Sequence, residues 1–407
     1  TLSSSSAASD VYKRQRAEPP SGDDGDGGDD GEGGGEVGEG GESGEGGEGG
    51  EGGESLSLAL ALEGAQPRGA RGGAVRAIFV SIEELRSARL PAELRRVRVL
   101  ALAVNAIGPR LAAADFAPSG RWLRELRLRD NRLSGDGGLG AALAGAPLLE
   151  LLDVDMNRLS TLAGLARAGG DGGARVGCAR LRALSAAGNL IDSTAGLDAC
   201  AALESVVLYR NKLTRLGPEL GALRRLRLLD VGRNALRSFD GALSRCASLR
   251  VLVAYENELA DAQLADELAA GALCSELWLS GNRLRSLGGA LGGALGGGWC
   301  ALHVLTVDVS DNALSQLDAL CVCLNLRTLN AAFNRVDALG ALAPLSACAK
   351  LRAMQLNDNP IASSRHYTHL LVLLLPALAE LDGEPLPATA HDEAARALLL
   401  PLSLIHI

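Results

Sequence analysis

The sequence predicts an α/β solenoid in which each unit adds one short strand to a continuous parallel sheet. An eleven-residue pattern, LxxLxLxxNxL, recurs about eleven times between Val97 and Ile361. Leucine and alanine dominate a chain that is 47% hydrophobic but only 3% aromatic, as expected of a repeated aliphatic core. The segments between copies carry apolar residues every three to four positions, which is typical of short helical turns.

Each copy of the pattern explains one strand and one turn of this solenoid. In copies such as LRELRLRDNRL and LRLLDVGRNAL, the LxL pair sends its leucines to one face and the intervening residue to the other. Stacked copies therefore build a horseshoe with the parallel sheet on its concave side. The connectors, as short helices, 3₁₀ turns and loops, form the convex side.

One asparagine follows the strand in every copy, at the point where the chain turns away. Its amide can both donate to and accept from backbone groups inside the turn, so the repeated residue predicts a hydrogen-bonded ladder. The asparagines are Asn105, Asn131, Asn157, Asn189, Asn211, Asn234, Asn257, Asn282, Asn312, Asn334 and Asn359.

Cysteine placement favours packing over chemistry. Five of the eight cysteines lie three residues before the first apolar residue of a copy, where equivalent side chains form a buried column. With no CxxC pair and no catalytic constellation, we expect no metal, no cofactor and no enzyme activity. Free thiols and the lack of Asn-x-Ser/Thr acceptors favour an intracellular, cytoplasmic location, with nucleus or cilium as alternatives. The five cysteines are Cys178, Cys200, Cys246, Cys323 and Cys348.

The two ends of the chain are expected to be foreign to the protein. DVYKRQ (10–15) and LSLIHI (402–407) are encoded by one DNA sequence read on opposite strands, and that DNA resembles a sequencing adapter. We therefore interpret 1–15 and 402–407 as adapter artefacts and the rest as a fragment of a longer protein. The final apolar run is shorter than the ~20 residues that cross a bilayer, so no membrane anchor is expected.

The acidity of the chain belongs to one segment. The formal charge is -9, yet residues 17–54 alone hold 14 acidic and no basic side chains. Such a Gly- and Glu-rich stretch lacks the apolar surface that folding requires. The predicted organisation is a disordered acidic tail at 16–74, an N-terminal cap or degenerate repeat at 75–96, repeats at 97–361, a C-terminal cap at 362–387 and a tail at 388–401.

These units of about 22 residues resemble the short intracellular subclass of leucine-rich-repeat proteins. A cap similar to that of the subclass follows the last copy: Asn359-Pro360-Ile361, then Tyr367, then LLVLLLPALAELD ending at Asp382. The subclass includes the regulatory subunit of type-one protein phosphatase, the axonemal dynein leucine-rich-repeat light chain and the spliceosomal A-prime protein. The spacing here is less regular than in the phosphatase regulator, and the acidic tail is a departure.

The resemblance implies a non-catalytic scaffold that binds a protein partner on its concave face. A phosphatase regulatory subunit, with the type-one catalytic subunit as partner, is the most specific version. Two alternatives stay open: an axonemal or ciliary, dynein-associated protein, and the recognition module of a larger, truncated enzyme. Nucleic acid is not an expected partner, because the strand face mixes charges of both signs. A monomer is expected.

The predicted binding surface follows from where the scarce aromatic residues fall. Four of them occupy positions between or just after the core leucines, which we expect to face solvent, with valines and charged residues beside them. A separate charged cluster, Arg127, Arg129, Asp153 and Asp155, fits an interface and simple solubility equally well. The predicted binding residues are Val207, Tyr209, Arg210, Asp230, Arg233, Val253, Tyr255, Glu256, Trp278, Asp308 and Phe333.

Overall fold

The computed structural model describes residues 77–79, 96–135, 139–167, 179–260, 274–287 and 303–403. Several predictions fall outside these ranges. They are the N-terminal adapter artefact, the acidic tail, most of the N-terminal cap, Cys178 and the last residues of the C-terminal adapter artefact.

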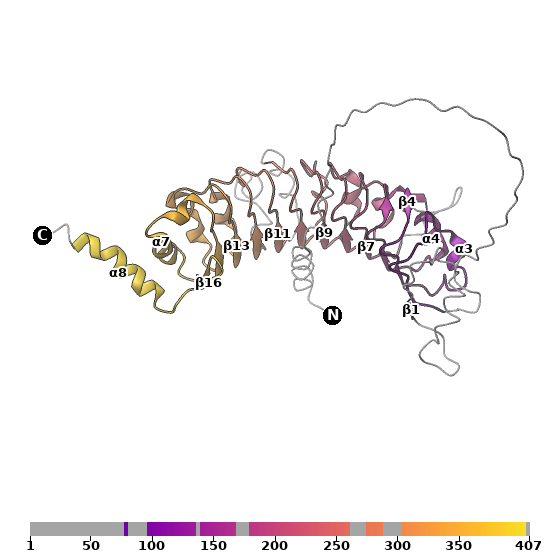
Figure 1. Ribbon diagram of the computed structural model, residues 1–407, viewed down its shortest axis with the longest axis horizontal. Coiled ribbons are helices and arrows are strands. Elements are labelled where there is room, and N and C mark those ends of the chain that lie inside the picture. The colour runs from indigo at the N-terminus through magenta and orange to yellow at the C-terminus, as the bar shows by residue number, and fades with distance from the viewer. Residues whose placement is uncertain are drawn as a thin grey trace, which may run out of the picture. The chain divides into compact units, whose positions relative to one another are not determined.

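A single parallel sheet runs through the described repeats, with the strands stacked in sequence order (Figure 1). Numbering the motif positions 1 to 11, each strand covers positions 3 to 5, and neighbouring strands pair in register. The repeat strands are β2 (Val99–Ala101), β3 (Glu125–Arg127), β5 (Leu151–Asp153), β7 (Ala183–Ser185), β8 (Ser205–Val207), β9 (Leu228–Asp230), β10 (Val251–Val253), β11 (Glu276–Trp278), β12 (Thr306–Asp308), β13 (Thr328–Asn330) and β14 (Ala353–Gln355).

The connectors lie on the other side of the core and confirm the predicted helical turns. Most are 3₁₀ helices of three to five residues, which suit the short distance from one strand to the next. The connecting elements are α3 (Ala113–Phe116), α4 (Leu139–Gly145), η1 (Ala163–Arg167), η2 (Leu197–Ala199), η3 (Pro218–Ala222), η5 (Asp318–Val322), η6 (Leu339–Ala341), η7 (Ala343–Ala347) and η8 (Pro360–Ser363). Strands β4 (Ser134–Gly135) and β6 (Arg158–Leu159) form a small second sheet after two of the turns.

Aliphatic residues from both sides fill one continuous core. The residues at positions 4 and 6 point inward as predicted, and Leu126 and Leu128 of β3 and the following turn are both 0% exposed. Because one such pair recurs in every repeat, burial grows with each added strand. No single repeat could bury its own leucines.

The predicted asparagine ladder is present and joins each repeat to the one before it. Asn131 shows the pattern: its Nδ2 donates to the carbonyls of Leu128 in its own repeat and Leu102 in the preceding repeat. Its Oδ1 accepts from the backbone N–H of Ile107, also in the preceding repeat, at 3.0 Å. Asn157, Asn189, Asn211, Asn234, Asn257, Asn282, Asn312, Asn334 and Asn359 repeat these contacts.

The residue before each ladder asparagine has left-handed backbone, which the sequence analysis missed. The asparagine must fold back beneath the strand to bond the carbonyls of its own repeat. The backbone reverses direction at position 8, one residue earlier. Glycine occupies it at Gly188 and Gly281, but Phe333 adopts φ 54°. A non-glycine residue there costs about 1 to 2 kcal/mol. The other non-glycine members are Val104, Asp130, Met156, Arg210, Arg233, Glu256, Asp311 and Asp358.

The C-terminal cap ends the ladder with a carboxylate instead of an amide. Asp382 Oδ1 accepts from the backbone N–H groups of Leu356 at 2.7 Å and Asn357 at 2.9 Å. Tyr367, at the start of α7 (Tyr367–Leu374), donates its hydroxyl to the other oxygen of Asp382 at 2.9 Å. The sheet closes with β15 (Glu380–Leu381), parallel to β14, and β16 (Glu384–Pro385), antiparallel to β15.

The segment predicted as a tail after the cap is helical. Helix α8 (Ala390–Ser403) packs on α7, where Ala394 is 0% exposed and contacts the cluster formed with Val372 and Ala390. Two alanines four residues apart give α8 a small apolar stripe that allows this close approach. Among the described helices, none combines the length and apolar character that crossing a bilayer requires.

Near β2 the sheet carries one further strand, β1 (Ala77–Phe79), parallel to β2. It lies within the predicted N-terminal cap or degenerate repeat. The described part of that segment therefore extends the sheet by a strand.

We expect Asn234→Ala to lower the free energy of unfolding by about 1 to 3 kcal/mol, because buried backbone groups lose their partner. Urea unfolding followed by circular dichroism measures this. Asn234→Asp should be at least as harmful at neutral pH, since a carboxylate keeps the acceptor for Leu213 N–H but places charge against the carbonyls that Nδ2 now binds. Lys212→Ala, at an exposed residue next to Leu213, is the control. Equal midpoints for all three variants would contradict the ladder.

The described cysteine column predicts slow thiol labelling. Burial raises the pKa of Cys246 and of Cys348 to about 11, so both thiols stay protonated at neutral pH. Cys200, Cys274 and Cys323 are 0% exposed, whereas Cys321 is half-buried. Among the described cysteines, a maleimide should modify Cys321 first in the native protein, read out for each cysteine by mass spectrometry. Rapid modification of Cys246 in the native protein would show that the column is wrongly placed.

Candidate functional site

The strand face consists of rows of equivalent side chains, one row for each outward position of the motif. Positions 3, 5 and 7 lie on or just after the strands, and position 8 lies where each chain leaves the sheet. Because the strands are about 4.8 Å apart, side chains of one row contact each other across repeats. The predicted binding residues occupy positions 5, 7 and 8 of repeats between β8 and β13.

Three of the four predicted exposed aromatics are in fact buried. Tyr209 is 8%, Tyr255 3% and Trp278 9% exposed. The reason for the two tyrosines is the gap left by Gly232, which lies between them at position 7. The Tyr255 ring fills this gap, so a Cβ added to Gly232 would lie 2.8 Å from Tyr255 Cε1, and the two tyrosine rings meet with centroids 6.0 Å apart.

Burial also governs the electrostatics of this group. Burial, with smaller contributions from Tyr209 and Asp230, raises the pKa of the Tyr255 hydroxyl far above its ordinary value. Val253 is 3% exposed because it pairs in register with Asp230 on one side and Trp278 on the other. These side chains form a packed floor on the sheet rather than free anchors, and their truncation would disturb packing.

Two of the carboxylates predicted beside the aromatics bond the backbone at the strand ends instead. Asp230 is 1% and Asp308 2% exposed. Each accepts a hydrogen bond from the backbone N–H two residues ahead, Gly232 for Asp230 and Ser310 for Asp308, both at 3.0 Å. In these two repeats the position-5 carboxylate therefore closes the strand end with a local turn bond. The expectation that these two residues face solvent is wrong.

Position 8 supplies the part of the predicted surface that does reach solvent. Phe333 is 56% exposed, and Arg210 and Glu256 are exposed as well. The Arg233 guanidinium binds the Glu256 carboxylate through two hydrogen bonds of 2.7 and 3.2 Å, and it lies 5.8 Å from the Tyr209 ring centroid. Val207 is half-buried beside this group.

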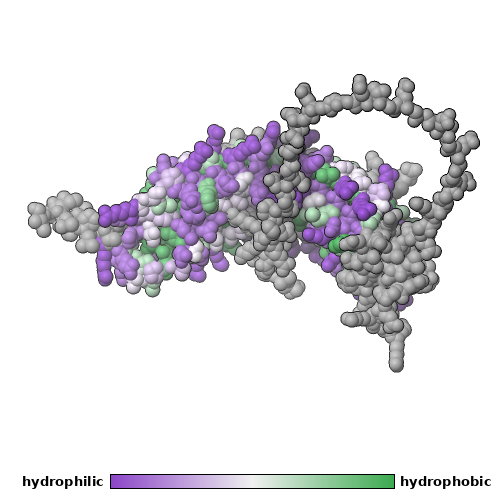
Figure 2. Space-filling view, in the orientation of Figure 1, coloured by the Kyte–Doolittle hydropathy of each residue, from purple (hydrophilic) through white to green (hydrophobic). Residues whose placement is uncertain are grey.

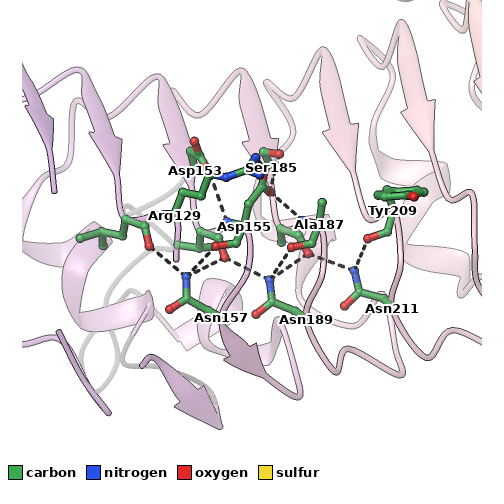
Figure 3. Close-up of polar contacts among 12 residues, drawn as sticks. Arg129, Asp153, Asp155, Asn157, Ser185, Ala187, Asn189, Tyr209 and Asn211 are labelled. Carbon is green, nitrogen blue, oxygen red and sulfur yellow. Dashed lines mark hydrogen bonds and ion pairs between the residues drawn. The ribbon is translucent and has the colours of Figure 1, made fainter. Parts of the chain in front are cut away.

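The charged cluster on the N-terminal repeats forms a real network around Asp155 (Figure 3). Asp155 Oδ1 accepts from the Ser185 hydroxyl at 2.6 Å and from the Ala187 N–H at 2.7 Å, and its other oxygen lies 3.5 Å from Arg129 Nη1. Asp153 accepts from the Asp155 backbone N–H at 3.1 Å. The fourth predicted member, Arg127, pairs with Glu125 instead, at 3.0 Å.

The ionised carboxylate of Asp155 destabilises the folded state. Burial, followed by the charge of Asp153, raises the pKa of this carboxyl, and the bonds from Ser185, Ala187 and Arg129 offset only part of the shift. A second carboxyl of the strand face, Glu276, also has its pKa raised by burial, which the Trp278 indole partly counters. Both carboxyls face the sheet surface without forming a catalytic pair.

The described ranges contain no grouping of three or more histidine, cysteine, aspartate or glutamate side chains that suits a metal ion. His366 and His369 have ring centroids 6.2 Å apart in and beside α7, without a third ligand. Trp122 is 40% exposed, with the Arg96 guanidinium 5.4 Å from its ring centroid.

Comparison with solved structures decides the fold. The chain superposes on an internalin from Listeria monocytogenes with TM-score 0.56 and 17% identity, covering 75% of this chain and 79% of that one. A leucine-rich-repeat protein of Leptospira interrogans gives TM-score 0.53 and 19% identity, covering 73% and 76%. The fold is a leucine-rich-repeat solenoid. A complex containing Latrophilin 3, Unc5D and the leucine-rich repeats of FLRT2 gives TM-score 0.53 and 20% identity, covering 68% and 80%.

Sequence comparison reaches only part of this leucine-rich-repeat chain. No family model matches it. The geranylgeranyl transferase type-2 subunit alpha of Sus scrofa is 34% identical over 110 residues, which are 27% of this chain and 18% of that protein. The Homo sapiens subunit is 34% identical over 108 residues, again 18% of its length. The chain thus matches less than a fifth of these relatives.

A pH-dependent test follows from the raised pKa of Asp155. The folded state holds this proton to higher pH than the unfolded state, so the destabilisation is absent below the unfolded pKa and complete above the folded pKa. Asp155→Asn should therefore gain stability relative to wild type as pH rises from acidic to neutral. Urea unfolding at both pH values measures the change, with the exposed Asp130→Asn as control. A pH-independent difference would contradict the assignment.

Proposed function

We propose that the chain is a non-catalytic protein-interaction scaffold whose partner docks along position 8 between β8 and β13. Phe333 carries the proposal. A large aromatic ring, 56% exposed on a left-handed backbone, contributes little to folding and is what a partner's pocket would bind. Hydrophilic residues dominate the described surface in Figure 2, where apolar residues form small separate patches.

The size and support of this surface fit a protein partner. Five in-register steps of about 4.8 Å separate the repeat of Arg210 from that of Phe333, a span of roughly 24 Å. That length suits a standard interface of about 800 Å² on each partner. The proposed contact layer consists of Arg210, Arg233, Glu256, Phe333 and the half-buried Val207. A buried floor beneath the contact layer holds that layer rigid. It consists of Tyr209, Asp230, Val253, Tyr255, Trp278 and Asp308.

The partner proposed first is the catalytic subunit of type-one protein phosphatase, on the strength of the resemblance of the repeats and cap. An axonemal or ciliary partner fits the same surface. A third candidate is favoured by the aligned 110 residues of geranylgeranyl transferase type-2 subunit alpha, a subunit of an enzyme by its name. Under that candidate these repeats are the recognition module of a larger enzyme, and the coding sequence on either side would contain a catalytic domain.

Phe333→Gly tests the surface without disturbing the fold, because Gly188 and Gly281 already occupy position 8 in other repeats. Loss of an aromatic anchor should weaken partner binding by about 2 kcal/mol, roughly thirtyfold. Val104→Gly is the matched control: the same motif position and a 45% exposed apolar side chain, but outside the proposed surface.

The two variants and wild type would be compared by titration with purified phosphatase catalytic subunit and by pull-down from lysate of the source cells. We expect Phe333→Gly to lose the partner and Val104→Gly to retain it. If both capture the same proteins as wild type in equal amounts, the docking surface lies elsewhere. Binding to the phosphatase that neither variant alters would keep the partner but reject the surface.

A further inference from the structure

A second charged surface lies at the end of the strands opposite to position 8. Position 2 of the motif directly precedes each strand, so its side chains line the edge where all the parallel strands begin. Arginine occupies this position in seven of the eleven repeats described above. We call this row the arginine edge. On the strand face, by contrast, charges of both signs are mixed.

Two of these arginines show what the arginine edge binds. Arg124 Nε lies 3.3 Å from a carboxylate oxygen of Glu150, the position-2 residue of the next repeat. Arg182 holds Glu204, again the next position-2 residue, through Nη2 at 2.8 Å and Nε at 3.0 Å. Wherever a carboxylate occurs in this row, a neighbouring guanidinium binds it. The flat guanidinium fork suits that geometry.

Four other members form no such pair with a described carboxylate. Arg98, Arg227, Arg327 and Arg352 are exposed, and within the described ranges none of them forms a salt bridge. Arg327 and Arg352 precede β13 and β14, whose strands pair in register, so two like charges lie on adjacent repeats. Like charges directly opposite each other are destabilising. The nearby Lys350 binds the amide oxygen of Asn325 at 2.6 Å rather than an acid.

We propose that the arginine edge binds an acidic peptide segment of a partner protein. Its glutamate or aspartate side chains would bind the guanidinium groups of Arg227, Arg327 and Arg352. They would do so in the way that Glu150 and Glu204 bind their neighbouring arginines. Charge complementarity and these internal carboxylate pairs favour an acidic peptide over nucleic acid. The inference goes beyond the proposed function, since it concerns another row and another partner chemistry, and either can hold alone.

The test uses the full chain and a fluorescent synthetic peptide of alternating glutamate and serine, with binding followed by anisotropy at low and physiological salt. The variant carries Arg227→Glu, Arg327→Glu and Arg352→Glu. The matched control carries Arg132→Glu, Arg158→Glu and Arg335→Glu, which make the same charge change at exposed position-10 residues beyond the other end of the strands. Circular dichroism and unfolding midpoints verify that both variants fold.

We expect the arginine-edge variant to bind the peptide at least about tenfold more weakly than wild type. The affinity of the control variant should stay within about threefold of wild type. Added salt should weaken peptide binding by wild type. Replacing the same three arginines by lysine should recover part of the affinity, and it keeps the test informative if the glutamate variant fails to fold. Equal loss in both glutamate variants, or no binding by wild type, would overturn the proposal. Tighter binding of an oligothymidylate of equal charge through the same arginines would assign the edge to nucleic acid instead.

Discussion

The hydrogen bonds of the ladder asparagines are the constraint on which the other features depend. From Asn131 onward each amide joins two repeats, because its oxygen accepts from the preceding repeat while its nitrogen donates to carbonyls of both, as at Asn211. This sets the stacking that buries the leucines. The same fold-back requires left-handed backbone one residue earlier, which turns that side chain outward. One amide per repeat thus determines both the interior and the row on which the proposed docking surface lies.

The repeat could be predicted from the sequence because its signal is periodic. The leucines, the asparagines and the described members of the cysteine column all lie where a fixed motif position puts them. The exposure of Tyr255 and Trp278 could not be predicted this way. Alternation along a strand tells which face a side chain is on, but burial on that face depends on neighbours across the sheet. Gly232, next to Tyr255 in the same row, was the available signal.

Two other misjudgements have the same origin. Asp230 and Asp308 are acidic residues of the strand face, which predicts exposure, yet each carboxylate accepts a hydrogen bond from the backbone N–H two residues ahead. The left-handed row has one signal in the sequence, because Gly188 and Gly281 both occupy it. In a repeat protein, each residue is best interpreted by comparison with the residues at the same motif position of the other repeats. Comparison of equivalent positions also reveals the arginine edge, in a chain whose formal net charge is -9.

The closing strand β16 has a consequence for association between molecules. A parallel sheet ends in a row of backbone groups that can recruit a strand from another chain. Here β16 runs antiparallel to β15 and carries Pro385, which lacks a backbone N–H, in register with Glu380. Growth of the sheet by end-on addition of another copy is therefore blocked at this terminus. Any filament built from these solenoids must begin with contacts other than strand pairing at the C-terminal cap.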